Sequence, residues 1–264
     1  MMYEIRDLRL SFPDMTRRPL LGPAPRTEVL KGLSFDVPKG AALGIVGGSG
    51  SGKSTLGRAM LRLLEPTGGT VVFDGVAITH ASEDPLRGIR RRFQMIFQDP
   101  MSSLNPRRKV GGIIAGPLKL HGMSDLPARV SEALDMVGLP RSFAGRFPHE
   151  LSGGQRQRVG IARAIALRPE FILADEIVSG LDVSSQAQVL NLLEELVRDL
   201  GLTLAFVSHD LSVIRRLCDR ILVLHQGVIV EEGETAALFT APQAAYTKEL
   251  LAAIPLPDPD QPWG

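Results

Sequence analysis

A glycine-rich stretch that ends in lysine and serine could hold a chain of phosphates. Residues 47–55 read GGSGSGKST and fit the pattern G-x-x-x-x-G-K-[ST]. In this pattern the glycines let backbone N–H groups turn inward around phosphate oxygens, the lysine reaches the β- and γ-phosphates, and the serine hydroxyl binds Mg²⁺. The alternative is a glycine-rich turn with a chance lysine, which the apolar run before it and the helix-like run after it disfavour. We therefore predict these nucleotide-binding residues: Gly47, Gly48, Ser49, Gly50, Ser51, Gly52, Lys53, Ser54 and Thr55.

Two adjacent acids at the end of an apolar run could serve the same phosphates. Residues 171–176 read FILADE, a strand-like run that ends in Asp175 and Glu176. An aspartate at such a place holds Mg²⁺, usually through water, and a neighbouring glutamate can polarise an attacking water. Alone, such a pair is more often a helix N-cap. Beside the phosphate loop, it predicts a metal site that includes Ser54 and Asp175, and a catalytic role for Glu176.

A second glycine motif, LSGGQ, occupies residues 151–155 and opens a helix-like run from Gln155 to Leu167. Two glycines before a helix form another helix start that can bind an anion. A second phosphate-directed loop is puzzling in one monomer. It is explained if the loop serves the nucleotide that another subunit binds.

Four apolar runs must position these groups. They cover residues 41–46, 93–97, 171–174 and 203–207, and each has polar residues at its carboxyl end. Gln98 follows the second run, and Ser208 and His209 follow the fourth. Ligands of open α/β sheets bind outside the carboxyl ends of the strands. We therefore expect these polar groups to converge at one edge of one sheet.

Helix-like runs alternate with these strands, as in an α/β fold. One follows the phosphate loop at residues 54–63, and Ser185 with Gln188 has the spacing of a capping box at the start of a longer helix. That helix places Val189, Leu193, Leu196 and Leu200 on one face. Residues 99–168 have no strong strand pattern and predict a helical insert. Two proline-rich segments, 13–26 and 255–264, predict a loop or exposed arm and an extended tail.

Composition excludes several classes of protein. The 264 residues carry a formal charge of +1, which gives no support to a nucleic-acid clamp, and 44% are apolar. The longest stretches without charge have 13 residues, too short to span a membrane, and residues 1–10 lack the apolar core of a signal peptide. Cys218 is the only cysteine, so disulfide frameworks and iron–sulfur ligation by this chain are excluded. We expect a cytoplasmic protein, with Cys218 as a small buried residue.

The motifs together resemble the nucleotide-binding subunit of ABC transporters, over residues 3–254. The resemblance is carried by the phosphate loop, Gln98, LSGGQ, FILADE, SGLD at residues 179–182, and His209. It implies an α/β fold: a P-loop NTPase core with a mixed sheet flanked by helices, an antiparallel β arm and an inserted α-helical subdomain. The domain would cover residues 1–254, with the helical subdomain at 99–168 inserted and a proline-rich tail at 255–264.

The resemblance also assigns roles. Two such subunits would stack head to tail around two ATP molecules with Mg²⁺. The signature loop would then face the nucleotide of the partner subunit, and it consists of Leu151, Ser152, Gly153, Gly154 and Gln155. Ser179 and Asp182 would lie in the loop between the subunits, and His209 would contact the γ-phosphate. Gln98 would act in catalysis, bind the metal together with Ser54 and Asp175, and link the metal site to the helical insert. Phe12 would stack on adenine, or else be a phenylalanine of the core or of a strand end.

Finer sequence features are similar to the importers of peptides and nickel. Residues 97–107 read FQDPMSSLNPR, and residues 181–193 and 244–255 fit the same branch. The family usually has Pro-x-Ser-Ala-Leu-Asp after the catalytic glutamate, whereas here Ile177, Val178 and Gly180 surround Ser179. We still expect ATP hydrolysis, because the acid, the histidine and the signature loop are intact. The substitution leaves the peptide and nickel, or metal-chelate, subtypes open.

This branch implies several partners. They are a second ATPase subunit (a paralogue, or a second copy of this chain), two transmembrane permease subunits and an extracytoplasmic substrate-binding protein. The chain would then lie at the cytoplasmic face of the inner membrane, held by the permeases. The alternative from a different class is a non-transport ABC ATPase of DNA repair or translation. It is disfavoured because residues 54–174 contain neither heptads nor cysteines, and because the near-zero charge predicts no nucleic-acid partner.

Overall fold

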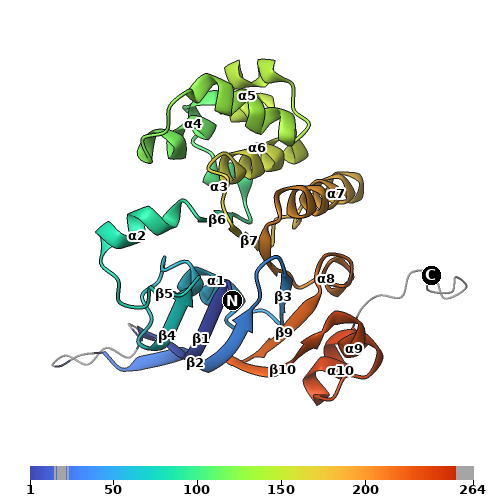
Figure 1. Cartoon of the computed structure of the whole chain (residues 1–264). Coiled ribbons are helices and arrows are strands. Elements are labelled where there is room, and N and C mark those ends of the chain that lie inside the picture. Colours follow the sequence, from blue (N-terminus) through green and yellow to red (C-terminus); the bar gives the residue numbers. More distant parts are fainter. Residues whose placement is uncertain (15, 17–21, 23, 254–264) are drawn as a thin grey trace, which may run out of the picture.

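Two sheets form the centre of the molecule in a computed structural model that describes residues 1–14, 16, 22 and 24–253 (Figure 1). The larger sheet has the order β10-β9-β3-β8-β7-β6. Its strands are β3 (Ala42–Val46), β6 (Phe93–Ile96), β7 (Phe171–Asp175), β8 (Thr203–Val207), β9 (Arg220–His225) and β10 (Val228–Glu234). All neighbours in it are parallel except β9 and β10, so the sheet is mixed, as predicted.

The register of the parallel strands brings their carboxyl ends together. Val207 of β8 lies opposite Ile45 of β3 on one side and Asp175 of β7 on the other. Residues that follow these strands therefore emerge at the same edge of the sheet. This is the arrangement expected from the four apolar runs, whose observed boundaries differ from the predicted ones by at most a residue.

The smaller sheet is antiparallel, with the order β2-β1-β4-β5. Its strands are β1 (Tyr3–Pro13), β2 (Arg26–Val37), β4 (Gly68–Phe73) and β5 (Val76–Ala77). The predicted irregular segment 13–26 is shorter than expected, because its end residues Pro13 and Arg26 pair with each other in the β1–β2 ladder. Residues 15, 17–21 and 23, and the tail at 255–264, lie outside the described residues.

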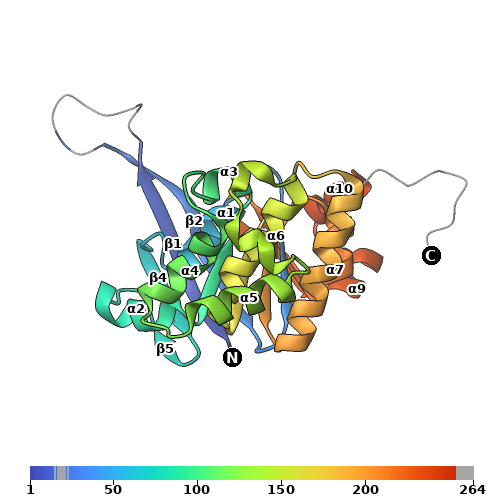
Figure 2. The ribbon, with the colours of Figure 1, turned by 90° about the horizontal axis from the view of Figure 1, so that it is seen from above.

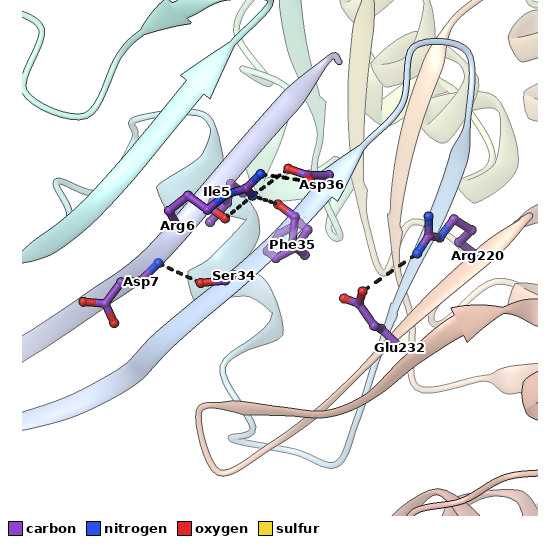
Figure 3. Close-up of polar contacts among 8 residues, drawn as sticks. All are labelled: Ile5, Arg6, Asp7, Ser34, Phe35, Asp36, Arg220 and Glu232. Carbon is purple, nitrogen blue, oxygen red and sulfur yellow. Dashed lines mark hydrogen bonds and ion pairs between the residues drawn. The ribbon is translucent and has the colours of Figure 1, made fainter.

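Polar contacts accompany the β1–β2 register (Figure 3). The Arg6 guanidinium donates to both carboxylate oxygens of Asp36, at 2.6 and 3.0 Å, and the backbone N–H of Asp7 donates to the Ser34 hydroxyl at 2.9 Å. A weaker ion pair at 3.8 Å joins Arg220 and Glu232 across β9 and β10. The ion pairs Arg6–Asp36 and Arg220–Glu232 are solvent-exposed, and an exposed ion pair contributes at most about 1 kcal/mol to stability. The apolar faces below them therefore dominate the stability of the sheets.

Helices cover the larger sheet and extend beyond it. They are α1 (Lys53–Met60), α2 (Glu83–Arg90), α3 (Pro100–Ser103), α4 (Val110–Leu120), α5 (Leu126–Met136), α6 (Gly153–Ile165), α7 (Val183–Leu200), α8 (Leu211–Leu217), α9 (Thr235–Thr240) and α10 (Ala245–Ala252), with 3₁₀ turns at Arg141–Gly145 and Pro148–Glu150. Between β6 and β7 the described chain contains helices but no strand, and α4, α5 and α6 gather at one end of the molecule (Figure 1). In the view from above, these helices lie in front of the sheets (Figure 2). Within the described residues, no helix is long and apolar enough to cross a membrane.

Alternation along the strands divides the core in two. On β3, Ala42 and Val46 face the core shared with α4–α8, whereas Leu43 and Ile45 face the core shared with α1 and the smaller sheet. Helix α1 lies in this second core through Leu56, Ala59 and Met60. The phosphate loop thus leads from a strand buried on both faces into a helix held between two sheets. Such a position fixes the loop on rigid elements.

One predicted helix start is wrong. The spacing of Ser185 and Gln188 places the start of the long helix at Ser185, whereas α7 begins at Val183 with Asp182 as its N-cap. The Asp182 carboxylate accepts the backbone N–H of Ser185 at 2.9 Å and the Ser185 hydroxyl at 2.7 Å. Ser185 is therefore a partner of the cap, one turn inside the helix. The predicted apolar face is otherwise observed, with Val189, Leu193 and Leu196 buried and Leu200 partly buried.

Candidate nucleotide-binding site

A cavity of about 440 Å³ opens at the carboxyl ends of the parallel strands. The loop between β3 and α1 forms most of its wall, and the ends of β7 and β8 and one residue of β2 complete it. Its lining residues are Val29, Ser49, Gly50, Ser51, Gly52, Lys53, Ser54, Thr55, Glu176 and His209. The predicted convergence of polar groups thus occurs for the phosphate loop, the acid that follows β7 and the histidine that follows β8.

The fold of the phosphate loop requires its glycines. Gly47 and Gly52 have φ values of +151° and +105°, which L side chains rarely adopt. A Cβ atom at Gly47 would also lie 2.1 Å from the carbonyl oxygen of Leu224. Gly52 is the N-cap of α1, and the first turn of the helix lines the cavity through Lys53, Ser54 and Thr55. The N–H groups at the start of a helix have no partner within the helix. These N–H groups and the positive helix end favour an anion at this place.

The Lys53 ammonium lies inside the loop. Only 7% of the residue is exposed, and Nζ donates to the carbonyl oxygens of Gly47 at 2.8 Å and Gly48 at 2.9 Å. Burial lowers the pKa of Lys53, and the nearby charges of Glu176 and Asp175 raise it in part. An ammonium group has three N–H donors, so the geometry leaves one for a phosphate oxygen.

Ser54 and Asp175 form the pair that sequence analysis predicts as a metal site. The Ser54 hydroxyl donates to Asp175 Oδ1 at 2.9 Å, and Asp175 is only 2% exposed. Burial raises the pKa of Asp175, and the hydrogen bond from Ser54 lowers it in part. Within the described residues no group of three or more metal-ligating side chains occurs. One hydroxyl and one carboxylate fit Mg²⁺, which keeps several waters and takes further oxygens from phosphates.

Glu176 lies between Gln98 and His209. The Gln98 amide donates to Glu176 Oε2 at 2.9 Å, and His209 Nδ1 lies 3.5 Å from Glu176 Oε1. Glu176 has a φ of +48°, a left-handed conformation that costs a residue with a side chain about 1–3 kcal/mol. The hydrogen bond to Oε2 places the Gln98 amide beside the glutamate. The other role predicted for Gln98, as a metal-binding residue, stays a prediction.

The signature loop lies at the start of α6. Ser152 is the N-cap: its hydroxyl accepts the N–H of Gln155 at 3.3 Å, and the Gln155 side chain accepts the N–H of Ser152 at 3.0 Å. Leu151 is buried, whereas Ser152 is exposed and Gly153, Gly154 and Gln155 are partly exposed. None of the five lines the cavity described above. The structure therefore does not bring this loop to the phosphate loop of its own chain.

Several other predicted residues lie outside the cavity lining. Four of them contact lining residues through the hydrogen bonds given above: Gly47, Gly48, Gln98 and Asp175. Ser179 is exposed in the turn after Glu176, and Asp182 caps α7. Phe12 is 40% exposed near the end of β1, where it pairs with Thr27 of β2. Ile177, which replaces the usual proline, is 1% exposed and packs in the helical side of the core. The Ile177 side chain thus anchors the turn after Glu176 to the core.

Sequence analysis missed two residues at the site. Val29 of β2 lines the cavity, and the Tyr246 hydroxyl of α10 accepts the backbone N–H of Gly48 at 2.7 Å. Val29 lies in a strand without any motif. Tyr246 belongs to the segment 244–255 that marks the importer branch, but the residues of that segment do not indicate a contact with the phosphate loop.

Comparison with known proteins decides the family. The sequence model of the ABC transporter family matches residues 30–179. The chain belongs to the ABC transporter family. It is 50% identical over 236 residues to a putative peptide import ATP-binding protein of Brucella ovis, covering 88% of this chain and 74% of the relative. It is 51% identical to the oligopeptide transport ATP-binding protein OppF of Bacillus subtilis, with 90% and 80% covered. The glutathione import ATP-binding protein GsiA of Shigella flexneri is 48% identical, with 97% and 42% covered.

Solved structures agree with this assignment. A dimeric ATP-binding cassette in a post-hydrolysis state, bound to ADP and Pi, superposes with a TM-score of 0.77 at 31% identity, covering 89% of this chain and 99% of the other. A cassette from Clostridium perfringens, part of an ABC transporter complex, gives 0.76 at 26% identity, with 91% of each chain covered. The predicted family and fold class are confirmed. The chain is therefore an ATPase that binds ATP.

Proposed function

We propose that this ABC ATPase hydrolyses ATP to energise an importer of peptides. The observation that carries the proposal is the cavity that Lys53 and Ser54 of α1 line together with Glu176, which follows β7. The names of the relatives, which specify import of peptides, oligopeptides and glutathione, support the substrate class. Glutathione is itself a small peptide-like compound.

The residues of the cavity divide the work of phosphoryl transfer to water. The loop N–H groups and Lys53 hold the β- and γ-phosphates, and Glu176 accepts a proton from the attacking water. Gln98 holds the Glu176 carboxylate through the 2.9 Å hydrogen bond, and His209 contacts the γ-phosphate from the other side. Ser54 and Asp175 hold Mg²⁺, which neutralises charge on the phosphates when it is bound. Phe12 stacks on the adenine beyond the cavity.

Each active site is shared between two ATPase subunits that associate head to tail. The signature loop is partly exposed at a helix N-terminus, outside its own chain's cavity, and this position supports a role toward the nucleotide of the partner. Ser179 and Asp182 lie in the loop between the two subunits. The second subunit is a paralogue, with a second copy of this chain as the alternative.

The transport function needs further partners. Two transmembrane permeases hold the ATPase at the cytoplasmic face of the inner membrane, and the helical insert at 99–168 docks on them. An extracytoplasmic binding protein delivers the peptide. The described helices include none that could cross a membrane, and a division of labour with permease subunits accounts for this.

Reconstitution tests the proposal. Proteoliposomes are assembled from the ATPase and the proposed partners: two permeases, a second ATPase subunit and a receptor protein. We expect receptor loaded with a small peptide to stimulate phosphate release several-fold, and Lys53→Ala to abolish it. If phosphate release is stimulated by receptor loaded with a nickel chelate and not by receptor loaded with peptide, the peptide assignment is wrong and the chain serves a metal importer. ATPase activity that responds to nucleic acid instead of the permeases would refute the transport function.

A further inference from the structure

The C-terminal helix α10 touches the phosphate loop through one side chain. The hydroxyl oxygen of Tyr246 accepts the backbone N–H of Gly48 at 2.7 Å, across 198 residues of sequence. Tyr246 is partly buried, and its ring centroid lies 3.9 Å from that of His225 at the end of β9. The contact joins the loop to an element that contributes nothing to the cavity lining.

Helix α10 is itself firmly attached to the sheet. The Glu231 carboxylate of β10 accepts the backbone N–H groups of Gln243 at 2.8 Å and Ala244 at 3.0 Å, directly before the helix. Leu250 and Leu251 pack against the apolar core beside α8 and α9. The Tyr246 hydroxyl is therefore held by a rigid support, which a positioning group requires.

The Gly48 peptide connects Tyr246 to the ammonium that binds phosphate. The carbonyl oxygen of Gly48 accepts from Lys53 Nζ at 2.9 Å and from the backbone N–H of Ser51 at 3.2 Å. Its N–H is fixed by Tyr246, so both sides of this residue are held by hydrogen bonds. A shift of Gly48 would move the acceptor of Lys53 and the turn that contains Ser51.

We propose that Tyr246 is a positioning residue of the ATP site, which holds the phosphate loop and Lys53 in place through Gly48. The inference rests on the binding of ATP at this loop and goes beyond it, because it makes α10 a part of the site. A typical hydrogen bond contributes about 0.5–1.5 kcal/mol, which corresponds to about a 2- to 12-fold change in an equilibrium constant. Removal of the Tyr246 hydroxyl should therefore weaken nucleotide binding by that factor.

The test compares the two tyrosines of the chain. Tyr246→Phe removes the hydroxyl that accepts from Gly48, whereas Tyr3→Phe, the control, removes a buried hydroxyl for which the described structure shows no hydrogen-bond partner. For each variant we measure the Kd of a fluorescent ATP analogue, KM and kcat for ATP, and Tm. We expect Tyr246→Phe to raise Kd and KM about 2- to 12-fold, with kcat within threefold of wild type and Tm lowered by no more than a few degrees.

The results separate positioning from a purely structural role. An unchanged Kd for Tyr246→Phe would overturn the proposal, even with a lower Tm, and so would an equal rise of Kd in Tyr3→Phe. Binding and hydrolysis by the wild-type chain, measured in the same series, test the ATPase function separately. A wild-type chain that binds no ATP at all would refute that function and, with it, the proposal that rests on it.

A double-mutant cycle checks that the effect passes through Gly48. A Cβ atom at Gly48 would lie 3.0 Å from the Tyr246 hydroxyl oxygen, so Gly48→Ala crowds that atom. The crowding is relieved when the hydroxyl is absent. We expect Gly48→Ala to weaken ATP binding less in the Tyr246→Phe background than in the wild type. Strictly additive effects on Kd would show that the two positions do not act together and would contradict the proposal.

Discussion

Replacing Glu176 with glutamine should block hydrolysis and spare ATP binding. The amide has the shape of the carboxylate but cannot accept a proton from water. Its oxygen can still accept the hydrogen bond that Gln98 donates at 2.9 Å. The left-handed backbone at Glu176, with φ of +48°, imposes the same strain on glutamine as on glutamate. The substitution therefore changes the chemistry of one group and little of its surroundings.

The geometry separates the effect on the barrier from the effect on the ground state. The substitution removes the carboxylate charge beside His209, but the two atoms are 3.5 Å apart and the His209 side chain is 64% exposed, so this contact contributes less than about 1 kcal/mol. Loss of a general base slows a reaction about 10²- to 10⁴-fold, or about 2.7–5.4 kcal/mol of the barrier. Because the greater of these two energies belongs to the transition state, kcat should fall while the Kd of ATP changes less than about fivefold.

Phosphate release at saturating ATP measures kcat, and size-exclusion chromatography with ATP measures association of the ATPase subunits. We expect Glu176→Gln to retain a closed dimer, because ATP binds and persists. The matched control is Glu195→Gln, an exposed glutamate of α7 outside the cavity, which should leave turnover unchanged. Turnover of Glu176→Gln within threefold of wild type would refute the role of Glu176 as base.

Three further predictions concern buried groups. Ile177→Ala should lower the free energy of unfolding, measured by urea titration, by about 2–5 kcal/mol. The control Val183→Ala, at an 83% exposed position, should change it by less than about 0.5 kcal/mol, and equal effects of the two substitutions would contradict the packing of Ile177. Asp175→Asn should raise Tm at neutral pH without nucleotide, because burial raises the pKa of Asp175. The gain should shrink as pH falls below that raised pKa and vanish at the lower pKa of the unfolded chain, and a gain that grows toward acid would contradict the prediction. Cys218, whose pKa burial also raises, should resist a thiol reagent at pH 8 until urea unfolds the chain; rapid labelling of the native protein would show it accessible.

The strands that carry the site could be predicted because their signals are local. Each apolar run ends in a glycine or polar residue, and parallel pairing then aligns those ends, as the register of Ile45, Val207 and Asp175 shows. Glycines of the phosphate loop are required by backbone conformation, which sequence reports directly. The start of α7 was mistaken because Asp182 and Ser185, three residues apart, are both good capping residues, and only the structure shows which one caps.

Contacts between distant segments could not be predicted in this way. Val29 reaches the cavity because β2 lies beside the β9–β10 turn, where the N–H of Lys31 donates to the carbonyl oxygen of Gly227 at 2.9 Å. Tyr246 reaches Gly48 because Glu231 and an apolar cluster fix α10. Neither placement follows from residue type or spacing. Phe12 illustrates the converse: its type indicates stacking, but its place depends on the bulges between β1 and β2.

The charges beside the phosphate loop fit the proposed association of two subunits around ATP. One chain supplies the Lys53 ammonium and two carboxylates, Asp175 and Glu176, so its own side chains oppose part of the charge of a triphosphate. Mg²⁺ and the N–H groups of the phosphate loop offset only part of this repulsion. The first turn of α6 offers further N–H donors at Gly153 and Gly154, at the surface and outside its own cavity. In the proposed head-to-tail dimer these donors complete the site of the partner, so the affinity between subunits depends on the γ-phosphate and falls once hydrolysis releases it.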